Sequence, residues 1–301
     1  MKKFSKARLE EALTAYLLLS PYLGVLVVFT FFSIIYAFYL SFHSYDLLSA
    51  PIHVGLRNYR TLLWDPDFRM AIKNTCIYTV WVVGLQTALA LLIAVILDQK
   101  LKGKPFFRAA FYFPSVTCSV VISLIFMWMF SKLGMINYVL SLVKEAPLLG
   151  WVPDDLDWLR DKRFALQSIM SLNIWTTSGT FMVIFLAGLQ SIPETVYEAA
   201  RIDGAHPFRV FWKITLPLLR PTIFFVVVMG MIGCFQVFDQ IYVMTNGGPL
   251  KSTLTVVYLI YSYAFRDFSM GYACAGAFLL FAVIFTATSL ARKFLDVEPE
   301  Y

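Results

Sequence analysis

Residues 74–97 read NTCIYTVWVVGLQTALALLIAVIL and contain no Asp, Glu, Lys or Arg. This stretch of 24 residues lies between Lys73 and Asp98. A helix needs about 20 mostly apolar residues to cross the roughly 30 Å hydrocarbon core of a bilayer. The stretch therefore predicts a membrane-spanning helix.

Five more long uncharged stretches lie on either side of the first one. They hold 34, 23, 30, 18 and 24 residues, and predict spans at about 12–42, 109–131, 164–190, 221–242 and 268–291. A shorter block, residues 252–265, has only 14 residues, so we expect an outer-surface or re-entrant helix there. The stretch nearest the N-terminus, at about 12–42, is longer than the roughly 7–15-residue apolar region of a signal peptide. We expect it to remain in the protein as the first helix.

The composition agrees with a membrane protein. Hydrophobic residues make up 59% of the 301 residues and charged residues 15%, against about 45–50% and about 25% in soluble domains. Helices buried in soluble proteins seldom run so long without charge, and runs such as Phe224–Val228 lack the alternation of barrel strands. The chain is predicted to be an all-α polytopic membrane protein, a single domain over 1–301 with about six transmembrane helices.

The distribution of positive charge predicts the orientation. Six spans place both termini on one side, together with segments 98–108 and 191–220. These inner segments carry 14 of the 25 Lys and Arg residues, so the positive-inside rule favours cytoplasmic termini. The net charge of +6 is explained by anionic lipid headgroups and requires no nucleic acid partner.

Residue types that carry catalysis or bind metals are sparse. The sequence has no His-Glu-x-x-His, no Gly-x-Ser-x-Gly and no paired carboxylates within a span, and its three histidines lie far apart. It also has no phosphate-binding Gly-x-x-x-x-Gly-Lys-Ser/Thr loop. We therefore expect no catalytic residue, metal or bound cofactor in this chain. The four cysteines are interpreted as small hydrophobic residues within helices: Cys76, Cys118, Cys234 and Cys274.

The loop 191–220 has its own helix signals. Ser191 followed by Glu194 is typical of a capping box, and Gly204 is suited to end a short helix. Ala199 and Ala200 leave one helix face without bulk, so another surface can approach closely, and Glu198 and Arg201 can pair weakly. His206-Pro207 is expected to start a second helical stretch, which Pro217 interrupts. An amphipathic connector on the membrane surface is the alternative, with Val196, Tyr197, Ile202 and Phe208 in the interface.

Two closely spaced motifs in this loop resemble a known family. They read Glu198-Ala199-Ala200-x-x-Asp203-Gly204-Ala205 and Phe211-x-x-Ile214-x-Leu216-Pro217-x-Leu219-Arg220-Pro221. The pattern resembles the EAA loop of permease subunits of binding-protein-dependent ABC importers. The carbohydrate-uptake branch, of the maltose-transporter F-type, is indicated by further motifs: Val54-Gly55-Leu56-x-Asn58-Tyr59, Asn74-Thr75, Phe107-Arg108 with Pro114, Gly134-x-Ile136-Asn137, and Phe238-Asp239-x-Ile241-Tyr242-Val243-Met244-Thr245-x-Gly247-Gly248-Pro249.

The resemblance implies a type I ABC importer transmembrane domain in the cell inner membrane. A second homologous permease would complete a heterodimeric pore, two ATPase subunits would use MgATP, and an extracytoplasmic solute-binding protein would deliver the solute. The loop would dock into a cleft on the ATPase, where Glu198 would meet a basic residue and Gly204 would supply a bend. The implied coupling residues are Glu198, Ala199, Ala200, Arg201, Asp203, Gly204 and Ala205.

Polar residues within the spans are candidates for a solute pathway. Gln236, Asp239 and Gln240 have the spacing of one helical face. Gln86 is isolated in the second span, and Asn173 and Trp175 belong to a polar and aromatic cluster in the fourth. Amides, carboxylates and aromatic rings suit the hydroxyls and ring faces of sugars. Hydrogen bonds between helices are the alternative explanation for each of them.

Two other functional classes fit the sequence less well. An ion-coupled secondary transporter needs ionisable groups near the midplane of the membrane, and only Asp239 is available, towards one end of its span. A membrane-embedded enzyme lacks the motifs above. The resemblance covers importers of oligosaccharides, polyols, sugar-glycerols and glycerol phosphates. The absence of Lys and Arg clusters within the spans favours a neutral solute.

Overall fold

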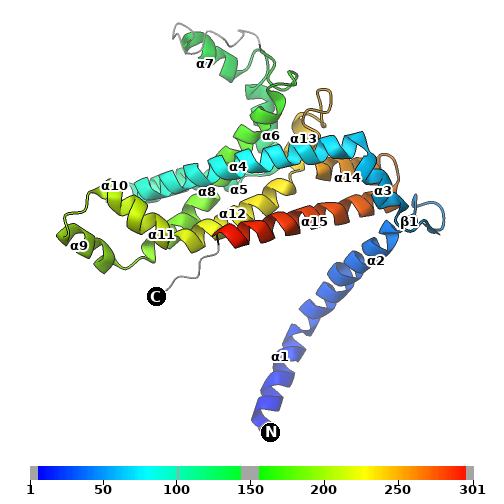
Figure 1. Cartoon of the computed structure of the whole chain (residues 1–301), viewed down its shortest axis with the longest axis horizontal. Helices are drawn as coiled ribbons and strands as arrows, with labels where there is room; N and C mark the ends of the chain where they lie inside the picture. Colours follow the sequence, from blue (N-terminus) through cyan, green and yellow to red (C-terminus); the bar gives the residue numbers. More distant parts are fainter. Residues whose placement is uncertain (1–5, 100–101, 144–155, 296–301) are drawn as a thin grey trace. The chain divides into compact units, whose positions relative to one another are not determined.

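The computed structural model of the chain describes residues 6–99, 102–143 and 156–295, and these are mostly helical (Figure 1). Lys2, Lys3 and Lys100, which contribute to the predicted orientation, lie outside the described residues, as do both chain ends. The elements are α1 Lys6–Val25, η1 Leu26–Phe31, α2 Phe32–Ser41, β1 His43–Ser44, β2 Ile52–His53, α3 Arg57–Trp64, α4 Pro66–Asp98, α5 Lys104–Val116, α6 Ser119–Met129, α7 Met135–Val143, α8 Ala165–Gln190, α9 Glu194–Ile202, α10 Pro207–Val210, η2 Phe211–Thr215, α11 Leu216–Leu218, α12 Arg220–Phe235, α13 Asp239–Met244, α14 Val256–Phe265 and α15 Met270–Leu295.

Five stretches of helix in the described part are long and apolar enough to cross a membrane. They are Glu11–Ser41, Pro66–Asp98, Ala165–Gln190, Arg220–Met244 and Met270–Lys293. They correspond to five of the six predicted spans. The block 252–265 holds α14, a helix of only 10 residues, which is too short to cross.

The third predicted span, 109–131, is not one continuous helix. α5 and α6 meet at an angle of 96°, with Thr117 and Cys118 extended between them. Pro114 lies one turn before the break and cannot donate a backbone hydrogen bond. The hydroxyl of Thr117 donates to the Phe113 carbonyl at 3.1 Å. This bond satisfies a backbone carbonyl that has no partner within the helix, because α5 ends here. The two helices together replace the predicted straight span.

The described residues fall into two compact units, those up to residue 63 together with 260–279, and the remainder. In the first unit, α1, η1 and α2 form one long helical run with Pro21 inside it. Proline has no N–H for the carbonyl four residues earlier, that of Leu17. The Ser20 hydroxyl donates to this carbonyl at 2.8 Å. Such replacement bonds allow a proline within a membrane helix.

The end of this helical run is tied to the short β-hairpin of the same unit. The Asn58 amide donates to the carbonyls of Ser41 and His43, each at 2.9 Å, and the Tyr59 hydroxyl donates to Ser41 Oγ at 2.7 Å. Gly271 approaches this site so closely that an added Cβ would lie 1.9 Å from the His43 carbonyl oxygen. The motif around Asn58 thus has a structural role in this unit.

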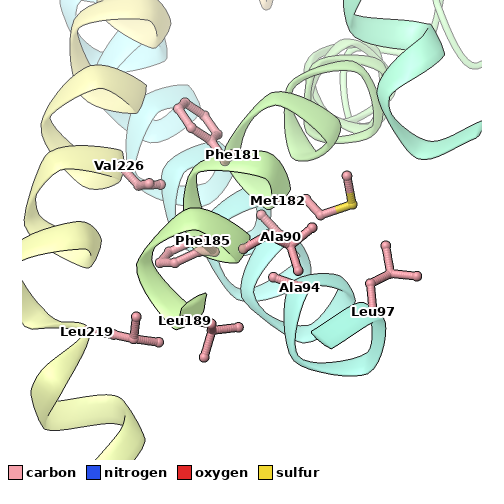
Figure 2. Packing of buried hydrophobic residues seen from close by; sticks show 10 residues of the cluster. Ala90, Ala94, Leu97, Phe181, Met182, Phe185, Leu189, Leu219 and Val226 are labelled. Atoms are coloured by element: carbon pink, nitrogen blue, oxygen red, sulfur yellow. The ribbon is translucent and has the colours of Figure 1, made fainter. Parts of the chain in front are cut away.

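In the second unit, α4, α8 and α12 form the core. Figure 2 shows Ala90 and Ala94 of α4, Phe181 and Phe185 of α8 and Val226 of α12, which belong to one buried cluster. The small alanines allow the backbones to approach and the aromatic rings fill the space. Because lipid tails are as apolar as leucine, such packing contacts rather than the hydrophobic effect hold membrane helices together.

One glycine fixes the approach of α5 to α8. A Cβ added at Gly179 would lie 2.1 Å from the Phe111 carbonyl oxygen. No real Cβ atom tolerates that distance, so only glycine permits this crossing. The contact holds the first half of the bent pair against the core.

Candidate functional site

The loop between α8 and α12 begins with α9, whose start differs from the prediction. No side chain caps α9, which spans Glu194–Ile202. Ser191 instead ends α8, where its hydroxyl donates to the Gly188 carbonyl at 2.7 Å. The predicted capping box is therefore wrong, because Ser191 binds a carbonyl at the end of α8 and does not cap α9.

The end of α9 is as predicted. Gly204 has a φ of +67°, in the left-handed region. The Ala205 N–H donates to the Ala200 carbonyl at 2.9 Å, and the Gly204 N–H donates to the Arg201 carbonyl at 3.0 Å. These two bonds make a Schellman motif, which needs a left-handed residue at this position. The chain direction after α9 is therefore fixed by Gly204.

α9 has one buried face and one exposed face. Ala200 is only 6% exposed and turns towards the rest of the loop. Glu198 and Ala199 are exposed, and Ile202 is 86% exposed. The predicted pair of Glu198 and Arg201 does not form in the structure, which describes both residues. Each is solvated, and an exposed pair of this kind contributes little.

The whole loop is anchored in the core at both ends. Leu189, just before the loop, and Leu219, at its end, belong to the same buried cluster as Phe185 (Figure 2). Between these two leucines, a hydrogen bond links α9 to η2: the Tyr197 hydroxyl lies 3.3 Å from Thr215 Oγ1. The loop is therefore tied to the end of α8 and the start of α12 through these two leucines.

A groove of about 720 Å³ separates α9 from the ends of α4 and α8. Asp98 and Gln190 line one side, and Glu194, Tyr197 and Arg201 line the other. Because α9 does not pack tightly on the helix ends, its outer face projects beyond the core.

The second half of the loop follows the predicted course with an added feature. The His206 ring accepts from the Phe208 N–H at 3.3 Å and starts α10, as expected from His206-Pro207. The next turn, η2, is a π-helix, in which the Leu216 N–H donates to the Phe211 carbonyl. α11 begins at Leu216 with Pro217 next, so the regular helix is interrupted before α12 begins at Arg220.

The polar residues of the spans fall into two groups. Gln86 is 1% exposed, and its Oε1 accepts from the Thr177 hydroxyl at 2.6 Å. Asn173 is 8% exposed, and its amide approaches Gln240 Oε1 at 3.5 Å. These contacts join α4 to α8 and α8 to α13; Gln86 and Asn173 are buried, and Gln240 is half-buried. In this conformation the side chains of Gln86, Asn173 and Gln240 make hydrogen bonds between helices, as the alternative to a solute pathway predicts.

The second group is exposed, and its predicted helical face does not exist. α12 ends at Phe235, and α13 begins at Asp239, with Gln236 to Phe238 between them. Phe238 has φ −136° and ψ −59°, outside the helical region. Gln236 and Asp239 are both exposed, but the break removes the i, i+3 relation assumed for them. Trp175 is 48% exposed and lies 5.4 Å from the Phe126 ring, between centroids.

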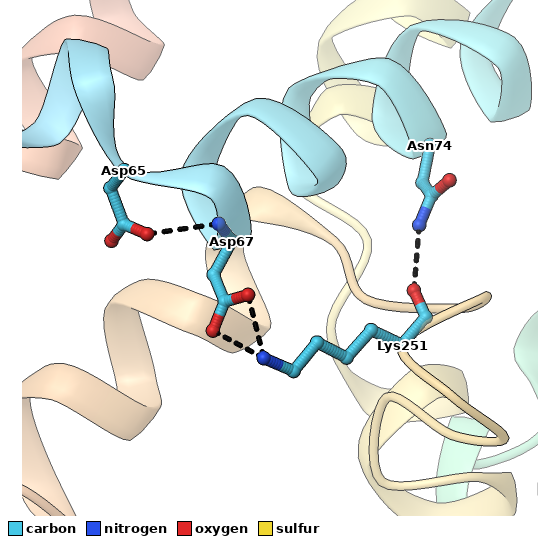
Figure 3. Close-up of polar contacts among 4 residues, drawn as sticks. All are labelled: Asp65, Asp67, Asn74 and Lys251. Carbon is cyan, nitrogen blue, oxygen red and sulfur yellow. Dashed lines mark hydrogen bonds and ion pairs between the residues drawn. The ribbon is translucent and has the colours of Figure 1, made fainter.

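Sequence reasoning missed a set of contacts at the opposite end of the unit. Figure 3 shows the Asn74 amide donating to the Lys251 carbonyl at 3.0 Å, and Lys251 Nζ paired with the Asp67 carboxylate at 2.6 Å. Asn74 also donates to the Leu254 carbonyl at 3.0 Å. The motif that contains Asn74 was visible in the sequence, but nothing there indicates a partner about 180 positions away.

The comparisons with known proteins identify the family. Residues 86–296 match the model of the binding-protein-dependent transport system inner membrane component. The chain belongs to this family. It is an ABC transporter permease of the inner membrane that crosses the bilayer several times and functions with a solute-binding protein.

Several known sequences are similar over nearly the full length of the permease. A probable ABC transporter permease protein of Bacillus subtilis is 35% identical over 97% of this chain and 93% of its own length. The multiple sugar-binding transport system permease protein of Streptococcus mutans is 37% identical over 89% and 90%. The trehalose/maltose transport system permease protein of Thermococcus litoralis is 33% identical over 96% of each chain.

A solved structure shows the same fold. A chain from a bacterial ABC transporter involved in the import of the acidic polysaccharide alginate superposes with a TM-score of 0.81, at 20% identity, over 97% of this chain and 98% of that one. The predicted type I importer fold is confirmed, and so is the prediction of a non-catalytic permease subunit. The secondary-transporter alternative is thereby set aside.

Proposed function

We propose that this permease is one half of a heterodimeric pore, paired with a second homologous permease and driven by two ATPase subunits. Its solute is a neutral sugar or sugar-like compound, such as an oligosaccharide, polyol or sugar-glycerol. An extracytoplasmic binding protein delivers the solute. The observation that carries the proposal is the projecting helix α9, whose loop is anchored at Leu189 and Leu219 in the permease core.

The coupling residues have distinct roles in this proposal. The exposed Glu198 and Ala199 form the face that enters a cleft on the ATPase, with Arg201 beside them. Ala200 faces inward, while Asp203, Gly204 and Ala205 end the helix and fix its direction. Closure of the ATPase dimer displaces α9, and the leucine anchors transmit the movement to α8 and α12. The permease then changes between two arrangements that face opposite sides of the membrane.

The orientation follows from the same role. α9 must lie on the cytoplasmic side, where ATP is available, and both chain ends then lie on that side as well. The positive charge of the inner segments supports this assignment. MgATP is used by the ATPase subunits, because this chain has no phosphate-binding loop of the Walker type.

The neutral solute is inferred from the chemistry of the spans. The uncharged stretches 74–97, 164–190 and 221–238 contain no Lys or Arg that would attract a phosphate or carboxylate. The candidate pathway residues in these stretches are Gln86, Asn173 and Gln236, together with Trp175, and Gln240 follows the third stretch. Amides bind hydroxyls and an indole ring packs on the apolar face of a sugar. The carbohydrate relatives in Streptococcus mutans and Thermococcus litoralis support this class.

Reconstitution tests the proposal. The two permeases and the ATPase are placed in proteoliposomes, and ATP hydrolysis is measured with the binding protein and each of maltotriose, raffinose, arabinotriose, sorbitol and glycerol 3-phosphate. We expect stimulation by a neutral compound and none by glycerol 3-phosphate. Liposomes with this permease alone should take up nothing. Uptake by the single chain under a proton gradient would contradict the proposal.

A further inference from the structure

An open pocket of about 590 Å³ lies at the far end of the second unit from α9. Its walls are the last turns of α6, residues 157–160 and residues 244–249. Residues 157–160 precede α8 and the coupling loop follows it, so about 39 Å of helix separates the two sites, at 1.5 Å per residue over 26 residues. The volume falls within the roughly 300–1,000 Å³ of small-molecule sites.

The first two walls are held together by one buried asparagine. The Asn137 amide donates to the Lys132 carbonyl at 2.9 Å and to the Leu156 carbonyl at 2.8 Å. Its Oδ1 accepts from the Trp158 indole N–H at 2.8 Å. Asn137 is 6% exposed and does not itself line the pocket. The end of α6 and the segment before α8 are therefore fixed relative to each other.

The third wall is held just as firmly. Thr253 Oγ1 donates to the Gly248 carbonyl at 2.7 Å and lies 2.7 Å from Thr245 Oγ1. Asn74 and the Asp67–Lys251 pair attach the following residues to α4 (Figure 3). Three of the motifs noted in the sequence, around Asn74, Asn137 and Thr245, thus build the frame of this pocket. A fixed frame favours binding because little order has to be gained.

The groups that face the pocket suit a sugar. Trp128 is 63% exposed and presents an aromatic surface. Arg160 Nε and Asp157 Oδ2 lie 3.6 Å apart, longer than a hydrogen bond, and the Arg160 side chain is 87% exposed. Both retain hydrogen-bonding capacity for hydroxyls. The neighbouring Arg163 is already engaged, because its guanidinium pairs with the Asp161 carboxylate at 2.7 Å, and this contact lowers the pKa of Asp161 to about 2.

We propose that this pocket is a saccharide subsite at the outer mouth of the permease, which holds one sugar unit of an oligosaccharide as the chain leaves the binding protein. Trp128 packs on the apolar face of the sugar ring, and Asp157 and Arg160 hydrogen-bond to its hydroxyls. The subsite favours solutes of more than one unit. This inference rests on the proposed function and specifies its substrate class.

The experiment uses the complete importer in nanodiscs with its binding protein. Sugar-dependent ATP hydrolysis is measured with maltotriose, raffinose and arabinotriose, and with glucose, galactose and arabinose as single units. Trp128→Ala and Arg160→Ala are compared with Trp128→Phe. Leu133→Ala and Lys162→Ala are matched controls, because both residues are exposed neighbours that do not line the pocket. The affinity of the sugar-free binding protein for the importer is measured for each variant.

We expect the two alanine variants to raise the KM for the active trisaccharide about three- to tenfold, with kcat and single-unit KM values unchanged. Trp128→Phe should keep most of the affinity, and the controls should match the unmutated importer. An unchanged trisaccharide KM would overturn the subsite while the importer function stands. Weaker docking of the sugar-free binding protein would instead assign the pocket to protein contact. Stimulation by none of the six sugars would refute the saccharide assignment altogether.

Discussion

Replacing Gly204 by alanine tests whether the end of α9 is a built stop that fixes the direction of the coupling loop. A Cβ added at Gly204 would meet nothing within 4 Å, so no steric clash contributes. The cost arises from the left-handed φ of +67° alone. For an ordinary residue this conformation costs about 1–2 kcal/mol. The two Schellman bonds, donated by Gly204 and Ala205, should open more often by the corresponding factor.

Hydrogen–deuterium exchange of the assembled importer in nanodiscs measures this opening. A cost of 1–2 kcal/mol corresponds to a rise in amide exchange of roughly 5- to 30-fold at residues 204 and 205. Gly204→Asn is the matched control, because asparagine adopts the left-handed conformation more readily and should raise exchange much less. Transport per ATP hydrolysed should fall in the same order. Unchanged exchange in the alanine variant, or an equal rise in both variants, would refute the reasoning.

Three further substitutions probe the coupling helix and its supports. Ala199→Leu should lower transport by about 5- to 150-fold while the permease folds normally, because the larger side chain would overpack the ATPase cleft at a cost of about 1–3 kcal/mol. Ala109→Leu, at another exposed helical alanine, is the control, and solute uptake by the assembled complex is the assay. Gly179→Ala should destabilise the permease by about 1–3 kcal/mol or more in thermal unfolding, since its Cβ would meet the Phe111 backbone; wild-type stability would contradict the close crossing. Tyr197→Phe removes one hydrogen bond between α9 and η2. It should reduce the ATP hydrolysis stimulated by the loaded binding protein about two- to tenfold, without a change in unfolding temperature. Full stimulation would show that Leu189 and Leu219 couple the loop to the core without this hydrogen bond.

The sequence predicted those features that depend on local composition. Uncharged length located the spans around α4, α8, α12 and α15, because a bilayer sets the length that a helix must reach. Gly204 was found because a helix stop needs a left-handed residue, and glycine adopts it at little cost. Such signals lie within a few residues of the structure that they determine.

The errors arose where neighbours compete or distant segments meet. Ser191 matched the pattern of an N-cap for α9, yet the C terminus of α8 engages it first. Pro114 is a local signal for the bend at Thr117, but a proline does not by itself specify a bend of 96°. Gln236 and Asp239 were placed on one helical face because the break at Phe238 leaves no mark in polarity.

The residues that hold the pocket walls together also could not be assigned a role from the sequence. Asn137 and Asn74 stood out in motifs, but their function as buried ties became evident only from carbonyl partners on other segments. An asparagine among apolar residues indicates that some polar group must meet it, because a buried amide needs partners. It does not indicate which one.

The central claim is that α9 meets an ATPase subunit, and crosslinking from Ala199 tests it most directly. A photoreactive benzoylphenylalanine is placed at position 199 in the complete importer within native membranes, and at exposed position 133 as a control for the outer side. Illumination should attach the ATPase subunit to the permease from position 199 and not from position 133. Adducts from position 199 only with lipid, or with the binding protein on the outer face, would contradict the account.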